Sequence, residues 1–247
     1  MSEFQYSEFR TVNRQLNQKE IEEVRKLSSR ARVSRDRAIF IYNFGDFRGN
    51  SDEVLLKYFD AFLYISNFGT KQLSFRIPTR LLKTQSLCPY EYEYIVEIEP
   101  YEHNTLVTLH FTNEKGGEWL EEEDCSALLD ELIPLREDLL LGDPQSLYLT
   151  LIANQEERQI EPYVQSLPAP PNLKELTSSL KSFAEFFEIT PDLLKQIGSQ
   201  SKDISQSPFD ITQLSDHEKN TFLQKVLEND PHARVELQNL LTQRSMK

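Results

Sequence analysis

The hydrophobic pattern of this 247-residue chain changes its period once, close to Gly116 and Gly117. Before that point, short segments alternate between apolar and polar side chains, which is the pattern of strands with one buried face. After it, apolar residues recur at helical spacing. A run of strands followed by a run of helices is typical of an α+β fold. We therefore predict a helix-covered mixed β-sheet in an N-terminal domain, followed by an all-α C-terminal part.

We predict five strands and two helices in the N-terminal domain. Asn17 and Glu20 form a capping box for the first helix. Asn50 or Ser51 caps the second, which we expect to continue to Ile65 and to be deeply buried, because residues 54–65 are apolar almost all round. Residues 36–44 carry apolar side chains on both faces, so we expect a strand in the middle of the sheet. The five strands are expected within 4–12, 36–44, 72–77, 92–98 and 105–111.

A proline-rich segment divides the helical half. Four prolines fall between residues 160 and 171, a composition typical of a stiff, extended linker. In the helix that follows, which a capping box of Asn172 and Glu175 is expected to begin, one stripe of apolar residues either docks on a partner or serves the module's own core. The stripe comprises Leu176, Leu180, Phe183, Ala184 and Phe187. The predicted domains are an α+β sheet domain (1–115), an acidic helical extension (116–159), the linker (160–171) and a small helical module (172–247).

Several classes of protein are disfavoured by composition. The longest nearly uncharged apolar stretch, residues 61–68, is far shorter than the ~20 residues of a membrane span. The N-terminal residues lack the basic and apolar regions of a secretory signal. Cys88 and Cys125 are distant in sequence, so we expect two reduced thiols, and the four scattered histidines predict no metal site. We expect a cytoplasmic protein with no cofactor and no membrane partner.

Charge is distributed unequally along the chain. Residues 91–140 contain fifteen acidic residues and two cations, an imbalance equal to the net charge of −13 of the whole chain. A short basic run lies in residues 25–37, and its cations are Arg25, Lys26, Arg30, Arg32, Arg35 and Arg37. Two interpretations follow. The run can bind nucleic-acid phosphates, or its arginines can pair with the acidic block, within the protein or across an interface.

The common catalytic and nucleotide-binding motifs are missing. The chain has only seven glycines, so we do not expect glycine-rich loops that bind phosphate. The loop 45–49 is the exception that we retain. It follows an apolar strand and precedes a helix, a position where ligands bind in open sheets. Arg48 can pair with an anion and Asp46 with a cation or hydroxyl. Alternatively, Asp46 and Arg48 bridge to each other, while the glycines satisfy the geometry of a turn.

Four stretches together resemble a group of uncharacterised bacterial proteins that are sometimes encoded near SWIM-type zinc-finger proteins. These stretches are residues 45–49, 58–64, 67–73 and 180–194. The resemblance implies a bacterial origin and work alongside a multi-protein system. It carries over no catalytic residue.

The leading functional hypothesis is a non-enzymatic accessory subunit of a bacterial multi-protein complex, with a protein partner or a second copy of the chain as its binding partner. The alternative is a nucleic-acid-associated protein that uses the basic run. A third hypothesis places a small-ligand or enzyme site at Asp46 and Arg48.

Overall fold

The computed structural model describes residues 3–45, 47–113, 116, 125, 127–203 and 210–245. The chain forms two compact units, Met1–Lys202 and Asp203–Lys247.

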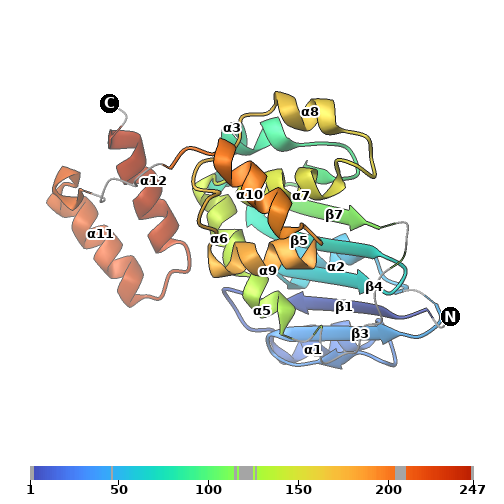
Figure 1. The fold of residues 1–247 in the computed structure, drawn as a ribbon. Coiled ribbons are helices and arrows are strands. Elements are labelled where there is room, and N and C mark those ends of the chain that lie inside the picture. The colour runs from blue at the N-terminus through green and yellow to red at the C-terminus, as the bar shows by residue number, and fades with distance from the viewer. Residues whose placement is uncertain are drawn as a thin grey trace. The chain divides into compact units, whose positions relative to one another are not determined.

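The first unit is built on a seven-stranded sheet, which confirms the α+β class (Figure 1). The strand order is β2-β3-β1-β4-β5-β7-β6, and each of these described pairings is antiparallel, whereas we expected a mixed sheet. The strands are β1 (Gln5–Arg10), β2 (Arg32–Val33), β3 (Arg37–Tyr42), β4 (Ala61–Ser66), β5 (Thr70–Pro78), β6 (Val96–Pro100) and β7 (Asn104–Thr112).

The insertion of β1 explains why the sheet is antiparallel. Both β3 and β4 pair with β1 in the antiparallel sense, so they run in the same direction without being neighbours. The connection from β3 through α2 (Ser51–Tyr58) to β4 is therefore a crossover between strands that β1 separates. The same order places β3 beside the two-residue edge strand β2, and not in the middle of the sheet as predicted.

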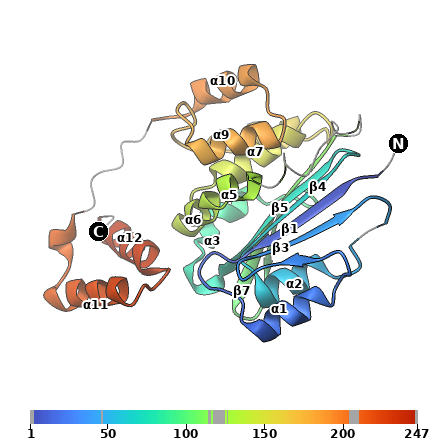
Figure 2. The same cartoon turned by 90° about the horizontal axis from the view of Figure 1, so that it is seen from below.

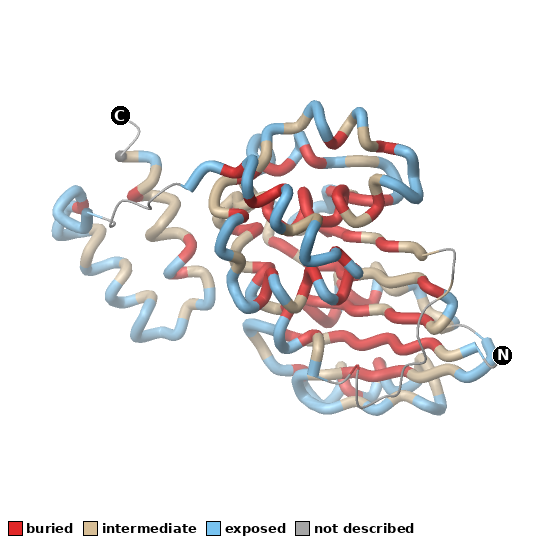
Figure 3. Tube along the Cα trace, in the orientation of Figure 1, coloured by how far each residue is buried: buried red, intermediate tan, exposed pale blue. Residues whose placement is uncertain are grey.

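Helices cover both faces of the sheet (Figure 2). One face carries α1 (Gln18–Arg25) and α2, and the other carries α5, α6, α7 and α9. The helices of the second half of this unit are α5 (Leu128–Leu132), α6 (Pro134–Leu141), α7 (Gln145–Asn154), α8 (Glu161–Ser166), α9 (Ser178–Phe186) and α10 (Pro191–Gln200). Between β5 and β6 lie η1 (Thr79–Leu81), α3 (Thr84–Leu87) and η2 (Cys88–Tyr90). Because both faces are covered, β1, β4 and β7 are buried over most of their length (Figure 3).

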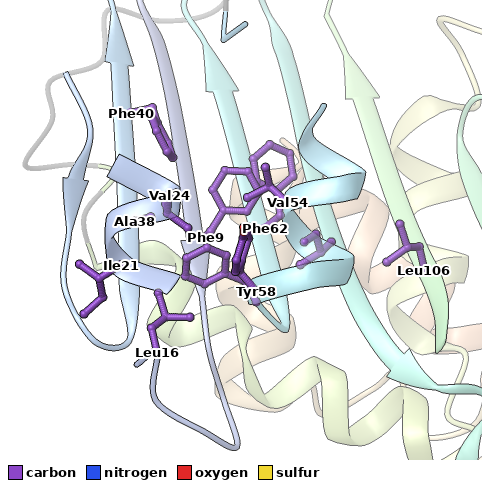
Figure 4. Packing of buried hydrophobic residues seen from close by; sticks show 12 residues of the cluster. Phe9, Leu16, Ile21, Val24, Ala38, Phe40, Val54, Tyr58, Phe62 and Leu106 are labelled. Atoms are coloured by element: carbon purple, nitrogen blue, oxygen red, sulfur yellow. The ribbon is translucent and has the colours of Figure 1, made fainter. Parts of the chain in front are cut away.

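An aromatic cluster fixes α1 and α2 on the sheet (Figure 4). Phe9 of β1 lies at its centre, with ring centroids 5.9 Å from Phe40, 5.5 Å from Phe59 and 4.4 Å from Phe62. Burial of each such side chain contributes about 1.5–3 kcal/mol. The predicted capping box of Asn17 is confirmed, and it directs α1 onto this cluster.

The predicted helix 54–65 is wrong in its second half. The helix ends at Tyr58, and residues 61–66 form β4, a strand with neighbours on both sides. The chain joins the sheet at Asp60. The Asp60 backbone N–H donates to Arg10 O, and its carbonyl accepts from Arg76 N. An all-round apolar pattern is shared by buried helices and central strands, and aromatic residues favour the strand.

Two further strand predictions need correction. The segment 92–98 becomes a strand only from Val96, because Tyr94 lies in a turn with φ +61°. The strand β2 was not predicted at all. It consists of two residues with one exposed side chain, which is too short to show alternation.

The proline-rich segment 160–171 is docked on the first unit and does not separate it from α9 and α10. Three of its proline carbonyls accept hydrogen bonds from distant side chains: Tyr90 to Pro168, Gln145 to Pro171, and Ser201 to Pro170. These contacts anchor the segment to η2, to the start of α7 and to the residue that follows α10. The unit consequently extends to Lys202.

The helix after this segment also begins later than predicted. Asn172 has φ +60° and caps no helix, whereas Thr177 accepts from the Leu180 N–H and begins α9. The apolar stripe of α9 is buried within the first unit, where Phe187 stacks on Phe111 of β7 at 5.6 Å between centroids. The stripe therefore serves the core of its own unit.

The second unit is a helical hairpin of α11 (Asp216–Leu227) and α12 (Ala233–Ser245), preceded by η3 (Ile211–Gln213). Ser215 and Glu218 form a capping box at the start of α11. Two ion pairs join α12 to α11, from Arg244 to Glu218 and from Lys225 to Glu236. No helix in the described part of either unit is long and apolar enough to cross a membrane.

Candidate functional site

The predicted ligand loop follows β3 and is anchored to the aromatic cluster. Phe47 points into the core, with its ring 4.7 Å from Phe40 and 6.0 Å from Phe9. Arg48, next along the chain, is exposed. Asp46 lies outside the described residues, so the proposed bridge between Asp46 and Arg48 stays a prediction.

Arg48 shares a pocket of about 420 Å³ with two members of the basic run, Lys26 and Arg30. Sequence analysis treated the loop and the basic run as separate candidates, and the structure brings part of each together. The lining residues are Lys26, Leu27, Ser28, Ser29, Arg30, Tyr42, Phe44, Gly45 and Arg48.

The β2–β3 hairpin explains this convergence. Arg32 pairs with Ile39 and Val33 with Ala38, and an antiparallel register continued backward places residues 28–31 beside the end of β3. The turn that follows α1 is held by the Ala31 N–H, which donates to Ser28 O. Leu27, in the turn after α1, and Tyr42, in β3, both pack against the aromatic cluster. The floor of the pocket is therefore continuous with the core.

The electrostatics of the pocket favour an anion. Lys26, Arg30 and Arg48 are exposed, and among the described residues none forms an ion pair or hydrogen bond with these three side chains. The described lining also contains no carboxylate. The C-terminal end of α1 lies at the pocket and carries roughly half a negative charge. Three full positive charges outweigh it.

One wall of the pocket is aromatic. Phe44 is 70 % exposed and has φ +98°, which is outside the region that side-chain-bearing residues commonly adopt. Such strain costs about 1–3 kcal/mol and is concentrated at functional sites. Gly45 follows with φ +99° and no atom where a Cβ would lie. The chain thus presents a large apolar ring to solvent at an energetic cost.

The other cations of the basic run have different surroundings. Arg25 donates from Nη2 to Val33 O at 3.2 Å. Arg37 contacts Glu8 Oε1 from Nε at 2.8 Å and Asp130 Oδ2 from Nη2 at 3.1 Å. Asp130 belongs to the acidic block 91–140, so for Arg37 the internal-pairing alternative is confirmed. Arg32 and Arg35 are exposed near the edge strand.

Sequence analysis missed a buried polar cluster under α5. Glu8 of β1 is fully buried and accepts a 2.6 Å hydrogen bond from the Tyr6 hydroxyl, with Arg10 Nη1 at 3.6 Å. Burial raises the pKa of Glu8 despite Arg37 and Arg10, and burial together with Glu8 raises the pKa of Tyr6. The alternation of Tyr6, Glu8 and Arg10 along β1 placed them on one face. It gave no sign that α5 would cover that face.

A second buried charge, Asp60, joins three elements of the scaffold. Its carboxylate accepts from Val12 N at 2.8 Å and from Arg76 Nη2 at 2.7 Å, while Arg136 Nη2 lies 3.9 Å away. Burial opposes ionisation of Asp60, but Arg76 and the Val12 N–H hold its pKa below the usual value. These contacts tie Asp60 to the loop after β1, to β5 and to α6.

Other candidate chemistry is weaker. The described residues contain no group of three or more His, Cys, Asp or Glu side chains placed to hold a metal ion. Cys88 is exposed and Cys125 buried, and no disulfide joins the two. Burial and Glu91 raise the pKa of Cys88, which makes it a poorer nucleophile at neutral pH.

Comparison with known proteins gives no match. No family model matches the chain, and no curated protein or solved structure is significantly similar to it.

Proposed function

We propose that this protein is a non-enzymatic binding protein that holds a small anionic ligand in the basic pocket. The observation that carries the proposal is the convergence of Lys26, Arg30 and Arg48 on one concave site. Guanidinium groups match phosphate and carboxylate oxygens bidentately, and an ammonium adds a mobile point charge. The pocket volume of about 420 Å³ falls in the range of about 300–1,000 Å³ that small-molecule sites occupy.

Binding is favoured over catalysis by the chemistry of the lining. Ser28, Ser29 and Tyr42 supply hydroxyl groups, but the described lining has no His, Cys, Asp or Glu that can act as a general base. A nucleophile needs such a partner within hydrogen-bond reach. The site can hold and orient an anion without an evident group to transform it.

The test is calorimetric titration of the full chain with inorganic pyrophosphate at ~50 mM salt. A variant with Lys26→Gln, Arg30→Gln and Arg48→Gln should lose affinity at least about 100-fold, because each charge-assisted hydrogen bond contributes roughly 1.5–3 kcal/mol.

The matched control carries Lys19→Gln, Lys195→Gln and Lys219→Gln. It changes the net charge by the same amount at lysines outside the pocket, whose carboxylate partners are 3.3–3.9 Å away. The control should bind pyrophosphate like the unmodified chain. Equal loss in both variants, or no binding by the unmodified chain, contradicts the proposal.

A second candidate function, an accessory subunit of a bacterial multi-protein complex, is favoured by the division of the chain. Residues 203–247 form a compact unit with buried residues of their own, among them Leu214, Val235 and Leu241. The sheet of the first unit has both faces covered by helices of that same unit. An appended unit of this kind is suited to hold a partner protein.

Affinity isolation tests this second candidate with two baits, the full chain and a chain that ends after Asp203. A partner that the full chain retains and the shortened chain loses supports the accessory role. A full chain that stays monomeric and retains nothing specific contradicts it.

A further inference from the structure

The basic pocket has two chemically different walls. Lys26, Arg30 and Arg48 supply positive charge, whereas Tyr42 and Phe44 supply aromatic surface. An anion such as sulfate or phosphate uses the first wall and leaves the second unexplained. The two walls together suit a ligand that carries both negative charge and a flat ring.

Phe44 is the residue that indicates a flat ring in the ligand. Large apolar side chains at a loop normally turn inward, as Phe47 does three residues later. Phe44 instead stays 70 % exposed on a strained backbone, at the rim of the pocket. An exposed aromatic face beside cations is the arrangement with which proteins stack an unpaired base while binding its phosphate.

We propose that the pocket binds a nucleoside phosphate, with the phosphates on Lys26, Arg30 and Arg48 and the base stacked on Phe44. This inference rests on the proposed function, since it names the ligand class of the same anion site. The two arginines can also lie flat against the base, because guanidinium planes stack on aromatic rings.

The free nucleotide is favoured over a nucleic-acid strand for two reasons. The site is a bounded pocket lined by three cations, and Arg37 of the same basic run lies against buried Glu8. A strand must also pass over a protein with a net charge of −13, which repels a long polyanion. A nucleotide places its few charges on the three cations alone.

Three probes separate the contributions of charge and ring. Pyrophosphate carries the charge without the base, adenosine carries the base without the charge, and ADP carries both. We expect ADP to bind the full chain roughly 5- to 150-fold more tightly than pyrophosphate, the gain that one base–aromatic stack provides. Adenosine alone should bind weakly.

Substitutions at Phe44 test whether its ring causes the higher affinity for ADP than for pyrophosphate. Phe44→Leu keeps an apolar side chain on the same backbone and should reduce ADP affinity to the level of pyrophosphate, without changing pyrophosphate affinity. Phe44→Trp should keep or increase ADP affinity, because it keeps a π face. Phe68→Leu is the control, since Phe68 is also a partly exposed ring, 46 % exposed, in the turn between β4 and β5.

The outcomes are distinct. If pyrophosphate binds and ADP binds no better, or if Phe44→Leu leaves the ADP advantage intact, the nucleotide inference is overturned and the anion site stands. If neither probe binds, the proposed function itself fails. A twelve-nucleotide single strand that binds more tightly than ADP, with a steeper salt dependence, overturns the free nucleotide in favour of a strand.

Discussion

Removal of the Asp60 charge should destabilise the first unit severely. Asp60 is 4 % exposed, and its carboxylate lies 2.7 Å from Arg76 Nη2. Arg136, the second cation in the cluster, is 5 % exposed. The substitution Asp60→Asn keeps the size of the side chain and an oxygen for the Val12 N–H. It leaves two guanidinium groups without their buried counter-ion.

The expected magnitude follows from this geometry. Breaking a buried ion pair by removing one partner costs about 3–5 kcal/mol, because the remaining charge stays desolvated. The loss of stability in Asp60→Asn should lie near the lower end of this range, because the hydrogen bond from the Val12 N–H can persist. With a denaturant slope of about 2 kcal/mol per molar urea, a loss of about 3 kcal/mol lowers the unfolding midpoint by roughly 1.5 M.

The pH dependence identifies the charge as the cause. The pKa of Asp60 is lower in the folded protein than in the unfolded chain. Its ionised form therefore stabilises the fold fully above the unfolded value of about 4, and this contribution disappears as the pH falls through the folded pKa. The difference between the unmodified chain and Asp60→Asn should be complete at pH 7 and should shrink below about pH 4.

Urea denaturation followed by circular dichroism at pH 7 and at pH 3 measures the loss of stability and its pH dependence. Asp192→Asn is the matched control, because the Asp192 side chain is 98 % exposed and its substitution should leave the midpoint unchanged. Two results refute the reasoning: a midpoint for Asp60→Asn that equals the control, or a destabilisation that is the same at both pH values.

Two other predictions concern the backbone and the division of the chain. Gly69→Ala should destabilise the protein by more than Gly45→Ala, because both glycines have φ above +90° but a Cβ at Gly69 meets Asn113 O at 2.2 Å whereas one at Gly45 meets nothing. Thermal melts of the two variants check this, and equal shifts contradict it. A chain that ends after Asp203 should retain the melting transition of the first unit, because that unit contains its own core. Loss of cooperative unfolding by that chain contradicts the predicted independence.

Local signals predicted the parts of the fold that depend on neighbouring residues. The capping boxes at Asn17 and Ser215 form as their sequences indicate, because every group in a capping box lies within three residues. Gly142 ends α6 with φ +82°, as a glycine after a helix usually does. The switch from alternating to helical spacing near residue 116 likewise predicted the α+β class.

The errors occur where distant contacts decide. Residues 61–65 are apolar on all sides, and only pairing with β1 and β5 makes them a strand. The prolines of 160–171 favour an extended segment, but the docking of their carbonyls on Tyr90, Gln145 and Ser201 makes that segment part of the core unit. No local pattern contains these partners.

The basic pocket was half predictable for the same reason. Arg48 and the basic run were each recognised, but their meeting depends on the register of β2 and β3, in which Arg32 pairs with Ile39. Once that register is known, residues 28–31 must lie beside the end of β3, because two antiparallel strands leave their hairpin turn in opposite chain directions.

The cation of Arg30 and the ring of Phe44 then face one pocket from two arms of a single hairpin. A shift of this register by one residue would move residues 28–31 relative to the end of β3 and separate Arg30 from Phe44. The same two-residue strand that sequence analysis overlooked thus determines the geometry on which the anion site and the nucleotide inference depend.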